Sequence, residues 1–126
     1  MNSANQKPLP LCGDGHLDPA HEAIVRSGIP SEDAAVDAAS LFAHLSDSTR
    51  VRILSMLAIS DMCVCEMADI LAMSQPAVSH HLRILRQCGV VRFRKQGQRA
   101  VYFLNDNETG ELIRRLLNAV CAGGEQ

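Results

Sequence analysis

Two cysteines separated by a single residue, Cys63 and Cys65, lie in the segment Met-Cys-Val-Cys-Glu-Met-Ala at positions 62–68. A buried cysteine is ordinarily a small apolar residue, but two closely spaced thiols followed by the carboxylate of Glu66 can also hold a soft metal ion. The segment therefore has two interpretations, packing or metal coordination. Residues elsewhere in the chain are needed to decide between them.

The composition indicates one compact domain in the cytoplasm. A chain of 126 residues, 47% of them hydrophobic, is long enough to bury a core. It has no run of about 18 apolar residues and no signal-peptide pattern at its start, so we expect neither a membrane location nor export. In the reducing cytosol its five cysteines are not expected to form a disulfide framework, which favours metal or redox chemistry for the clustered pair.

The beginning of the chain is predicted to be an arm outside the folded domain. Prolines and glycines interrupt the stretch around Cys12, which shows no helical period. A short helix is expected from Pro19 to about Arg26. We therefore predict a flexible N-terminal arm with a short helix at 1–30 and a folded domain at 31–122.

Hydrophobic periodicity predicts helices and one β-hairpin within the folded domain. Apolar residues recur at helical spacing as far as Gly89, and the period then changes to that of strands. Polar caps and turn residues set the limits of the elements. Helices are expected at 31–46, at 48–58 after the cap Asp47, at 64–72 and at 75–88; strands at 90–94 and 99–104 with a loop at 95–98; and a last helix capped by Asn105 or Asp106.

The order of these elements is that of a winged helix-turn-helix. A tight break at Ser74-Gln75-Pro76 separates two of the helices, because Ser74 can cap the second helix and Pro76 is tolerated in its first turn. The hairpin that follows supplies the wing. The predicted fold class is therefore mainly α with a small β-hairpin.

Basic residues are concentrated in this motif, although the net charge of the whole chain is −2. Between Ile70 and Asn105 there are six basic residues and no acid. This asymmetry is typical of a surface that binds nucleic acid. Three Phe, one Tyr and no Trp argue against stacking on single strands, so we expect double-stranded DNA.

Candidate DNA-binding residues lie on two elements of the motif. On helix 75–88, the face opposite the apolar residues carries groups suited to base edges in a major groove. These groups are Gln75, Ser79, His80 and Arg83. The hairpin adds Arg94, Lys95 and Arg99, which would reach phosphates or the minor groove. Arg86 and Arg92 can equally be ordinary solvated surface.

Three stretches of the sequence closely resemble the ArsR/SmtB family of metal-responsive bacterial repressors. They read LSDSTRVRILSML, MCVCEMADIL and SQPAVSHHLRILRQCGVVRFRKQGQRAVYFL. The resemblance covers roughly residues 34–120. It implies a homodimer built from the first long helix and the last helix, bound to double-stranded operator DNA and released by a metal ion.

The resemblance also implies a metal site at the helix that follows the thiol pair. In the family this site combines cysteines at the start of that helix with Cys or His of the N-terminal arm. The corresponding residues here are Cys12, His16, Cys63 and Cys65. Three sulfurs and one nitrogen form a tetrahedral set that suits Zn(II) or Cd(II) or, with fewer ligands, Pb(II). His21 and Glu66 are reserve ligands.

A second family site, on the last helix, is not supported by the residues present. That site requires Asp-x-His followed by a further His and a carboxylate. Here Asp106 and Glu108 begin the set, but Ala119 and Ala122 occupy the later positions. Arsenite repressors of the family add a third cysteine three residues after the pair, where this chain has Ala68. Arsenite is therefore the less favoured inducer.

The remaining cysteines and two histidines are expected to be structural. Cys88 directly precedes the helix-ending Gly89, and Cys121 lies near the end of the last helix, so both are predicted to be packing residues. His44 and His81 are predicted to have partners inside the protein.

Thiol chemistry is the alternative class of function. Two thiols could form a redox switch or, with a histidine, a nucleophilic centre. Side chains two residues apart at a helix start are expected to point apart, and Asp61, Glu66 and Asp69 are expected to raise the thiol pKa values. An enzyme would also need a cleft and oxyanion donors, of which the sequence gives no sign. The prediction is a metal-responsive repressor and not an enzyme, with an arsenite-responsive or thiol-redox-responsive repressor of the same fold as the alternative.

Overall fold

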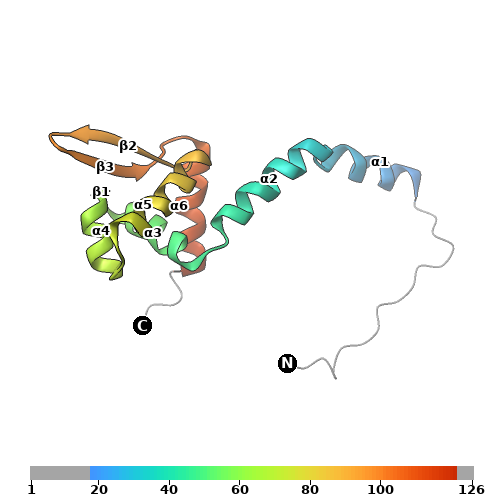
Figure 1. Ribbon diagram of the computed structural model, residues 1–126. Coiled ribbons are helices and arrows are strands. Elements are labelled where there is room, and N and C mark those ends of the chain that lie inside the picture. The colour runs from blue at the N-terminus through green and yellow to red at the C-terminus, as the bar shows by residue number, and fades with distance from the viewer. Residues whose placement is uncertain (1–17, 122–126) are drawn as a thin grey trace, which may run out of the picture. The chain divides into compact units, whose positions relative to one another are not determined.

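The computed structural model of the protein describes residues 18–121, which contain six helices and three short strands (Figure 1). In chain order these are α1 (Pro19–Gly28), α2 (Glu32–Leu45), α3 (Ser48–Ile59), β1 (Met62–Cys63), α4 (Val64–Leu71), α5 (Gln75–Gln87), β2 (Val91–Gln96), β3 (Arg99–Leu104) and α6 (Glu108–Cys121). Every predicted helix and both predicted strands are present, with ends shifted by at most two residues. The predicted winged helix-turn-helix is confirmed.

The chain divides into two compact units whose boundary falls within α2, between Ala35 and Val36. The predicted division at residue 30 stays a prediction. In the first unit, Asp18 caps α1 by accepting a hydrogen bond from the backbone N–H of His21 at 3.2 Å. Carboxylates and hydroxyls favour this position because the first N–H groups of a helix lack partners within it.

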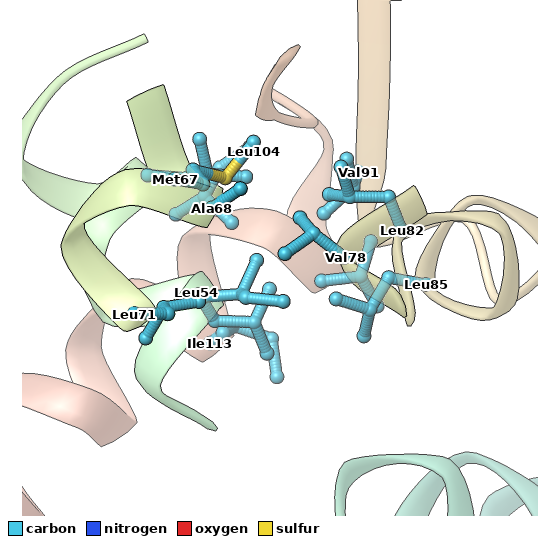
Figure 2. Close-up of a cluster of buried hydrophobic side chains, with 13 residues drawn as sticks. Leu54, Met67, Ala68, Leu71, Val78, Leu82, Leu85, Val91, Leu104 and Ile113 are labelled. Atoms are coloured by element: carbon cyan, nitrogen blue, oxygen red, sulfur yellow. The ribbon is translucent and has the colours of Figure 1, made fainter. Parts of the chain in front are cut away.

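The second unit is held together by one cluster of buried apolar side chains. The cluster comprises Ile53, Leu54, Leu57, Met67, Ala68, Leu71, Val78, Leu82, Leu85, Val90, Val91, Leu104 and Ile113. Figure 2 shows side chains of α4 and α5 gathered around Leu54 and Ile113. Truncating one such leucine to alanine typically costs about 2–5 kcal/mol, so this cluster fixes the position of α5 within the unit.

The break between α4 and α5 is made by three consecutive residues. Ala72 ends α4 in the left-handed conformation, at φ 55°. Met73 then donates its N–H to the carbonyl of Ala68 at 3.0 Å, and Ser74 caps α5 by accepting from the N–H of Ala77 at 3.2 Å. A non-glycine residue rarely adopts a positive φ, so tertiary packing determines this turn.

The sheet has one more strand than the sequence indicated. Its order is β1-β3-β2 with antiparallel pairing throughout, and β1 pairs Met62 with Tyr102 and Cys63 with Val101. The hairpin pairs Gln96 with Arg99, so its loop is Gly97 and Gln98 and not the predicted 95–98. Gly97 has φ 67°, which suits a tight hairpin turn because glycine carries no Cβ.

The connection from the hairpin to α6 corrects the predicted helix cap. Asn107, and neither Asn105 nor Asp106, caps α6 by accepting from the N–H of Gly110 at 2.9 Å. Asn105 instead donates its side-chain amide to the carbonyl of Gly89 at 2.9 Å. A Cβ at Gly110 would lie only 1.7 Å from the carbonyl oxygen of Asn105, so the helix start and this loop touch backbone to backbone.

Within residues 18–121, none of the helices combines the length and the apolar character needed to cross a bilayer.

Candidate metal centre and nucleic-acid interface

The two thiols of the candidate metal centre lie against each other. The sulfur atoms of Cys63 and Cys65 are 3.1 Å apart. The expectation that these side chains point apart is therefore wrong. The reason is that Cys63 is the extended cap residue before α4, at φ −92° and ψ 168°, whereas Cys65 is already in the helix, and this change of backbone conformation turns the two side chains toward each other.

Cys63 is the more constrained of the two residues. It is 5% exposed, while Cys65 is exposed. Its backbone N–H donates to the carboxylate of Glu66 at 2.9 Å, and its sulfur faces the backbone N–H of the same residue, as in a capping box. In the sheet it lies opposite Val101 of β3. Cys63 is thus joined to both α4 and the hairpin.

The surroundings of Cys63 favour its neutral thiol. Burial raises the pKa of Cys63, and its hydrogen bond with Cys65 acts in the same direction. The carboxylate of Glu66 raises it further, whereas the positive charge of Arg99 lowers it. The pKa of Glu66 is lowered chiefly by the N–H of Cys63. The expected rise in thiol pKa is present at Cys63, but burial is a larger cause of it than the neighbouring acids.

The geometry of the pair is compatible with shared coordination of one ion. Two thiolates bound at about 2.3 Å to a tetrahedral ion lie about 3.8 Å apart. The observed separation of 3.1 Å therefore has to open by less than one ångström. The exposed Cys65 side chain can make this movement without disturbing the core.

The other predicted ligands are placed only in part. Cys12 and His16 lie outside the described residues, and the reserve ligand His21 is exposed on α1. Among residues 18–121, no group of three or more His, Cys, Asp or Glu side chains is arranged to hold a metal ion. The reserve ligand Glu66 already accepts the N–H of Cys63.

The structural roles expected for other cysteines and histidines are met in part. His81 accepts a hydrogen bond at Nδ1 from the guanidinium of Arg50 at 3.2 Å, which confirms its internal partner. The same guanidinium donates to the carbonyl of His44 at 2.9 Å, while a partner for the His44 imidazole stays a prediction. Cys88 is partly buried against the core, as predicted, but Cys121 is exposed.

The candidate DNA-reading face of α5 is open. Val78, Leu82 and Leu85 are buried on one side of the helix. On the other side Gln75, His80 and Arg83 are exposed and Ser79 is partly exposed. The 3.6-residue period therefore predicted the two faces of this helix correctly.

The basic residues of the hairpin differ in their contacts. Arg94 pairs with Asp61 at 3.0 Å, and its guanidinium lies 5.5 Å from the centre of the Phe103 ring. Lys95 and Arg99 are exposed. Arg99 also lowers the pKa values of Cys63 and Glu66 through its charge, so it acts on the thiol segment as well.

The sequence did not reveal that Asp61 pairs with Arg94 or that Arg86 contacts an aromatic ring. Asp61 is 33 residues from its partner Arg94, and no local pattern connects them. The Arg86 guanidinium lies 4.6 Å from the centre of the Phe93 ring, a cation–π distance. Its position five residues before the strand gave no signal of this contact, because hairpin geometry creates it.

Comparison with protein families and known proteins agrees with this arrangement. The model of the family described as "Bacterial regulatory protein, arsR family" matches residues 47–92. A transcriptional repressor SmtB homolog of Synechocystis is 36% identical over 90% of this chain and 86% of its own. A cadmium resistance transcriptional regulatory protein CadC homolog of Staphylococcus aureus is 38% identical over 64% of this chain and 67% of its own.

Solved structures show the same fold. HlyU from Vibrio cholerae superposes with a TM-score of 0.64 at 33% identity, over 72% of this chain and 99% of that chain. The homodimeric winged helix-turn-helix DNA-binding domain of Mb0332 from Mycobacterium bovis gives a TM-score of 0.62 at 27% identity, over 77% of this chain and 88% of that chain.

Proposed function

The chain belongs to the arsR family of bacterial regulatory proteins, and on this premise we propose that it is a metal-responsive repressor. The proposed repressor binds operator DNA as a homodimer and is released from it by a soft divalent ion. Proteins of this fold and family are transcriptional regulators and not enzymes. The proposed inducer is Cd(II), Pb(II) or Zn(II). Its proposed ligands are Cys12, His16, Cys63 and Cys65.

The observation that carries the metal response is the contact between Cys63 and Cys65, whose sulfurs lie 3.1 Å apart at the start of α4. Two thiols this close form a soft, chelating donor pair, which favours thiophilic ions over Mg(II) or Ca(II). The relative described as a cadmium resistance regulator supports the same class of inducer. Cys12 and His16 would complete a tetrahedral set from the N-terminal arm.

DNA binding is proposed for α5 and the hairpin. The open face of α5 offers Gln75, Ser79 and His80 to base edges, and Arg83 continues this face toward the hairpin. Arg94, Lys95 and Arg99 would contact the flanking phosphates. A second copy of the motif, presented by a homodimer, would bind the second half of the operator.

Exposed apolar side chains support the proposed homodimer. On α6, Leu112, Leu116 and Val120 are 59%, 49% and 69% exposed. Leu116 and Val120 also line an apolar hollow of about 180 Å³ that Leu45 of α2 and Val51 of α3 help to form. Side chains of this kind gain stability when a partner covers them. The homodimeric Mb0332 domain has the same fold.

The proposed mechanism links the thiols to the wing within one protomer. A bound soft ion would supply charge neutralisation for the two thiolates, including that of Cys63, whose pKa is raised by burial in the free protein. Cys63 lies opposite Val101 of β3 and caps α4, so a shift at this residue would affect two elements that hold the DNA-binding surface. The metal-loaded protein would then favour a spacing of the two recognition helices that no longer matches successive major grooves.

Spectroscopy of the metal-loaded protein tests this function. Cd(II) or Co(II) added to the full chain should give sulfur-to-metal absorption whose intensity reports three thiolates, together with release of fluorescent operator DNA. A chelator should restore DNA binding. If thiol reactivity is lost on adding an oxidant and returns only with a reductant, the thiol-redox alternative is correct, since the two sulfurs are close enough to react.

Arsenite is the second alternative inducer. It is favoured by the thiol pair and by a relative, the arsenical resistance operon repressor of Staphylococcus aureus, 36% identical over 57% of this chain and 69% of its own. The position where arsenite repressors carry a third cysteine is Ala68, which is buried in the core. Release by arsenite at concentrations below those of Cd(II) would favour this alternative.

A further inference from the structure

Three arginines converge on an open pocket between α5 and β2. The pocket has a volume of about 370 Å³. We call it the arginine pocket, and its lining residues are Arg83, Arg86, Gln87, Val91, Arg92 and Phe93. Three of these residues lie at the end of α5, the recognition helix, and the other three, including buried Val91, lie at the start of β2.

One guanidinium of this pocket stacks on an aromatic ring, and within residues 18–121 none of the three pairs with an acid. Arg86 lies over Phe93 at 4.6 Å, and the Phe93 ring in turn packs against Tyr102 with ring centres 5.4 Å apart. Among the described residues, the arginines that pair with a carboxylate are Arg26, Arg94 and Arg114. None of the three pocket arginines does so.

A cluster of like charges without a counter-ion favours an external anion. Each guanidinium repels the others, and this cost is relieved when an anion enters. The planar N–H fork of arginine matches the oxygen atoms of a phosphate group, and stacking on Phe93 holds one fork in place before binding. The chemistry of the pocket therefore selects a phosphate group.

We infer that the arginine pocket is a phosphate site that clamps the DNA backbone between the recognition helix and the wing. This inference rests on the proposed DNA-binding function. With α5 in a major groove and the hairpin over the neighbouring minor groove, the strand between the two grooves passes the junction of α5 and β2. Arg86 and Arg92 then become DNA ligands, although the sequence left them as possible solvated surface.

The pocket also changes the role of Arg83. Its sequence position suggested contact with base edges, but in the fold its side chain lines the phosphate site with Arg86 and Arg92. Phosphate contacts strengthen binding without reading sequence. Base readout is thereby left to Gln75, Ser79 and His80 in the first half of α5.

Salt-dependent binding by charge-removing variants tests the clamp. Affinities of the wild-type dimer, Arg86→Gln, Arg92→Gln and Arg83→Gln would be measured on operator and random duplexes by fluorescence anisotropy over a range of salt. Each substitution should weaken both duplexes by the same factor. Each should make the slope of log K against log salt shallower by about 1.8, since a dimer loses two phosphate contacts worth about 0.9 each.

Two controls separate the clamp from general effects. Arg115→Gln removes an exposed arginine of α6 that lines a hollow with Glu108 and Glu111, and its slope should equal that of the wild type. Arg86→Lys keeps the charge but not the planar fork, so it should keep most of the slope at reduced affinity. Circular dichroism would verify that Arg86→Gln is folded without its contact to Phe93.

The outcomes of these measurements distinguish failure of the phosphate clamp from failure of the proposed DNA-binding function. If the wild type binds no duplex DNA, the proposed function fails. If the wild type binds DNA and the salt slopes of Arg86→Gln and Arg92→Gln equal that of the wild type, only the clamp fails. If inorganic phosphate at millimolar concentration perturbs the arginine resonances of the DNA-free protein while both DNA slopes stay unchanged, the pocket binds a free anion instead, which also overturns the clamp.

Discussion

The thiol segment and the last helix are both places where members of this fold family can hold metal, yet they differ in what their side chains offer. The thiol segment, residues 61–66, places two sulfurs 3.1 Å apart and pairs β1 with the hairpin. The last helix, α6, instead exposes Leu112, Leu116 and Val120 along one side. The same architecture thus presents sulfur donors beside the sheet and an exposed apolar side on the last helix.

This difference shows that the fold determines where a residue lies, whereas its side chain determines what that position can bind or contact. Ala119 of α6 carries no side-chain donor that could bind a metal ion. In contrast, Cys63 is hydrogen-bonded to Glu66 of α4 and lies opposite Val101 of β3, so a change at Cys63 can affect both elements. The predictions below set one region against the other.

The largest expected effect is the loss of metal response when a thiol of the segment is removed. Cys63→Ser and Cys65→Ser should each abolish release of operator DNA by Cd(II), because a neutral hydroxyl cannot replace a thiolate on a soft ion. Their metal-free forms should bind operator with nearly wild-type affinity, since serine is close in size to cysteine. A titration of the operator complex with Cd(II), followed by fluorescence anisotropy, measures both properties.

Cys121→Ser on α6 is the matched control and should behave as the wild type. Cys12→Ser should have an intermediate effect, because His21 or Glu66 can take the vacated position. Release of the Cys63→Ser protein at the wild-type concentration of Cd(II) would show that the thiol pair only packs, and would move the sensing site toward α6.

The next largest effect is expected on association at α6. Leu116→Lys should weaken the dimer at least 100-fold, because burial of one leucine contributes about 1.5–3 kcal/mol and a symmetric dimer loses two of them. Analytical ultracentrifugation measures the monomer–dimer equilibrium directly. Leu116→Met should leave it nearly unchanged, and a Leu116→Lys protein that remains dimeric at micromolar concentration would place the interface on another surface.

Two arginines that each have one acidic partner allow a closer comparison, because one pairs with the thiol segment and the other lies on α6. Arg94 of β2 is 50% exposed and pairs with Asp61, while Arg114 of α6 is 40% exposed and lies 3.9 Å from Glu111. The wild-type slope of log K against log salt should be about −11, if the six basic residues between Ile70 and Asn105 touch phosphate in each of the two protomers. Arg94→Gln should make this slope shallower by about 1.8.

Arg114→Gln should leave the slope unchanged and lower stability instead, because Arg114 donates to the carbonyl of Ala58 at 2.8 Å. A wild-type slope shallower than about −2 is incompatible with the proposed DNA-binding surface. Equal slopes in the two variants would mean that the hairpin does not approach the DNA backbone more closely than α6 does.

The smallest effect concerns the caps of α4 and α6, which differ in charge. Glu66 accepts the N–H of Cys63 as a carboxylate, and this contact lowers its pKa. Its contribution to stability is therefore complete above the unfolded pKa of about 4.3 and is lost as the pH falls through the lowered folded value. The neutral amide of Asn107 has no such dependence.

Unfolding by urea at pH 7 and at pH 3 measures this difference. Glu66→Gln should be less stable than the wild type at pH 7, and the two should converge at pH 3. Asn107→Ala should lose about 1 kcal/mol at both pH values, as is typical for loss of a helix cap. A deficit of Glu66→Gln that persists at pH 3 would contradict the assigned contact.

Local signals made most of the fold predictable. Ser74 and Pro76 mark the start of α5 and Gly89 its end, because caps and turns depend on neighbouring residues. The faces of α5 followed from its period. In contrast, β1 is two residues long and forms only because Tyr102 and Val101 lie beside it, so no pattern within the strand could reveal it.

The candidate sites could be predicted only as far as they depend on residues that are close together in the sequence. The closeness of Cys63 and Cys65 depends on a change of backbone conformation between them, which their spacing does not specify. The arginine pocket exists because α5 meets β2, and residue spacing on the helix alone favoured base contact for Arg83. Among Asn105, Asp106 and Asn107, all suitable caps, tertiary contacts of the loop decided which one caps α6.

Gly110 sets a limit on how this protein can be redesigned. Any larger residue there would drive its Cβ to 1.7 Å from the carbonyl oxygen of Asn105, so the start of α6 is locked to the end of the hairpin. An engineer who wished to install new inducer specificity on α6 would have to vary the solvent-facing positions after Gly110 and leave this junction intact. The angle at which α6 leaves the wing cannot be changed, and Leu112, Leu116 and Val120 are needed for the proposed dimer, so only the other solvent-facing positions of the helix are available for diversification.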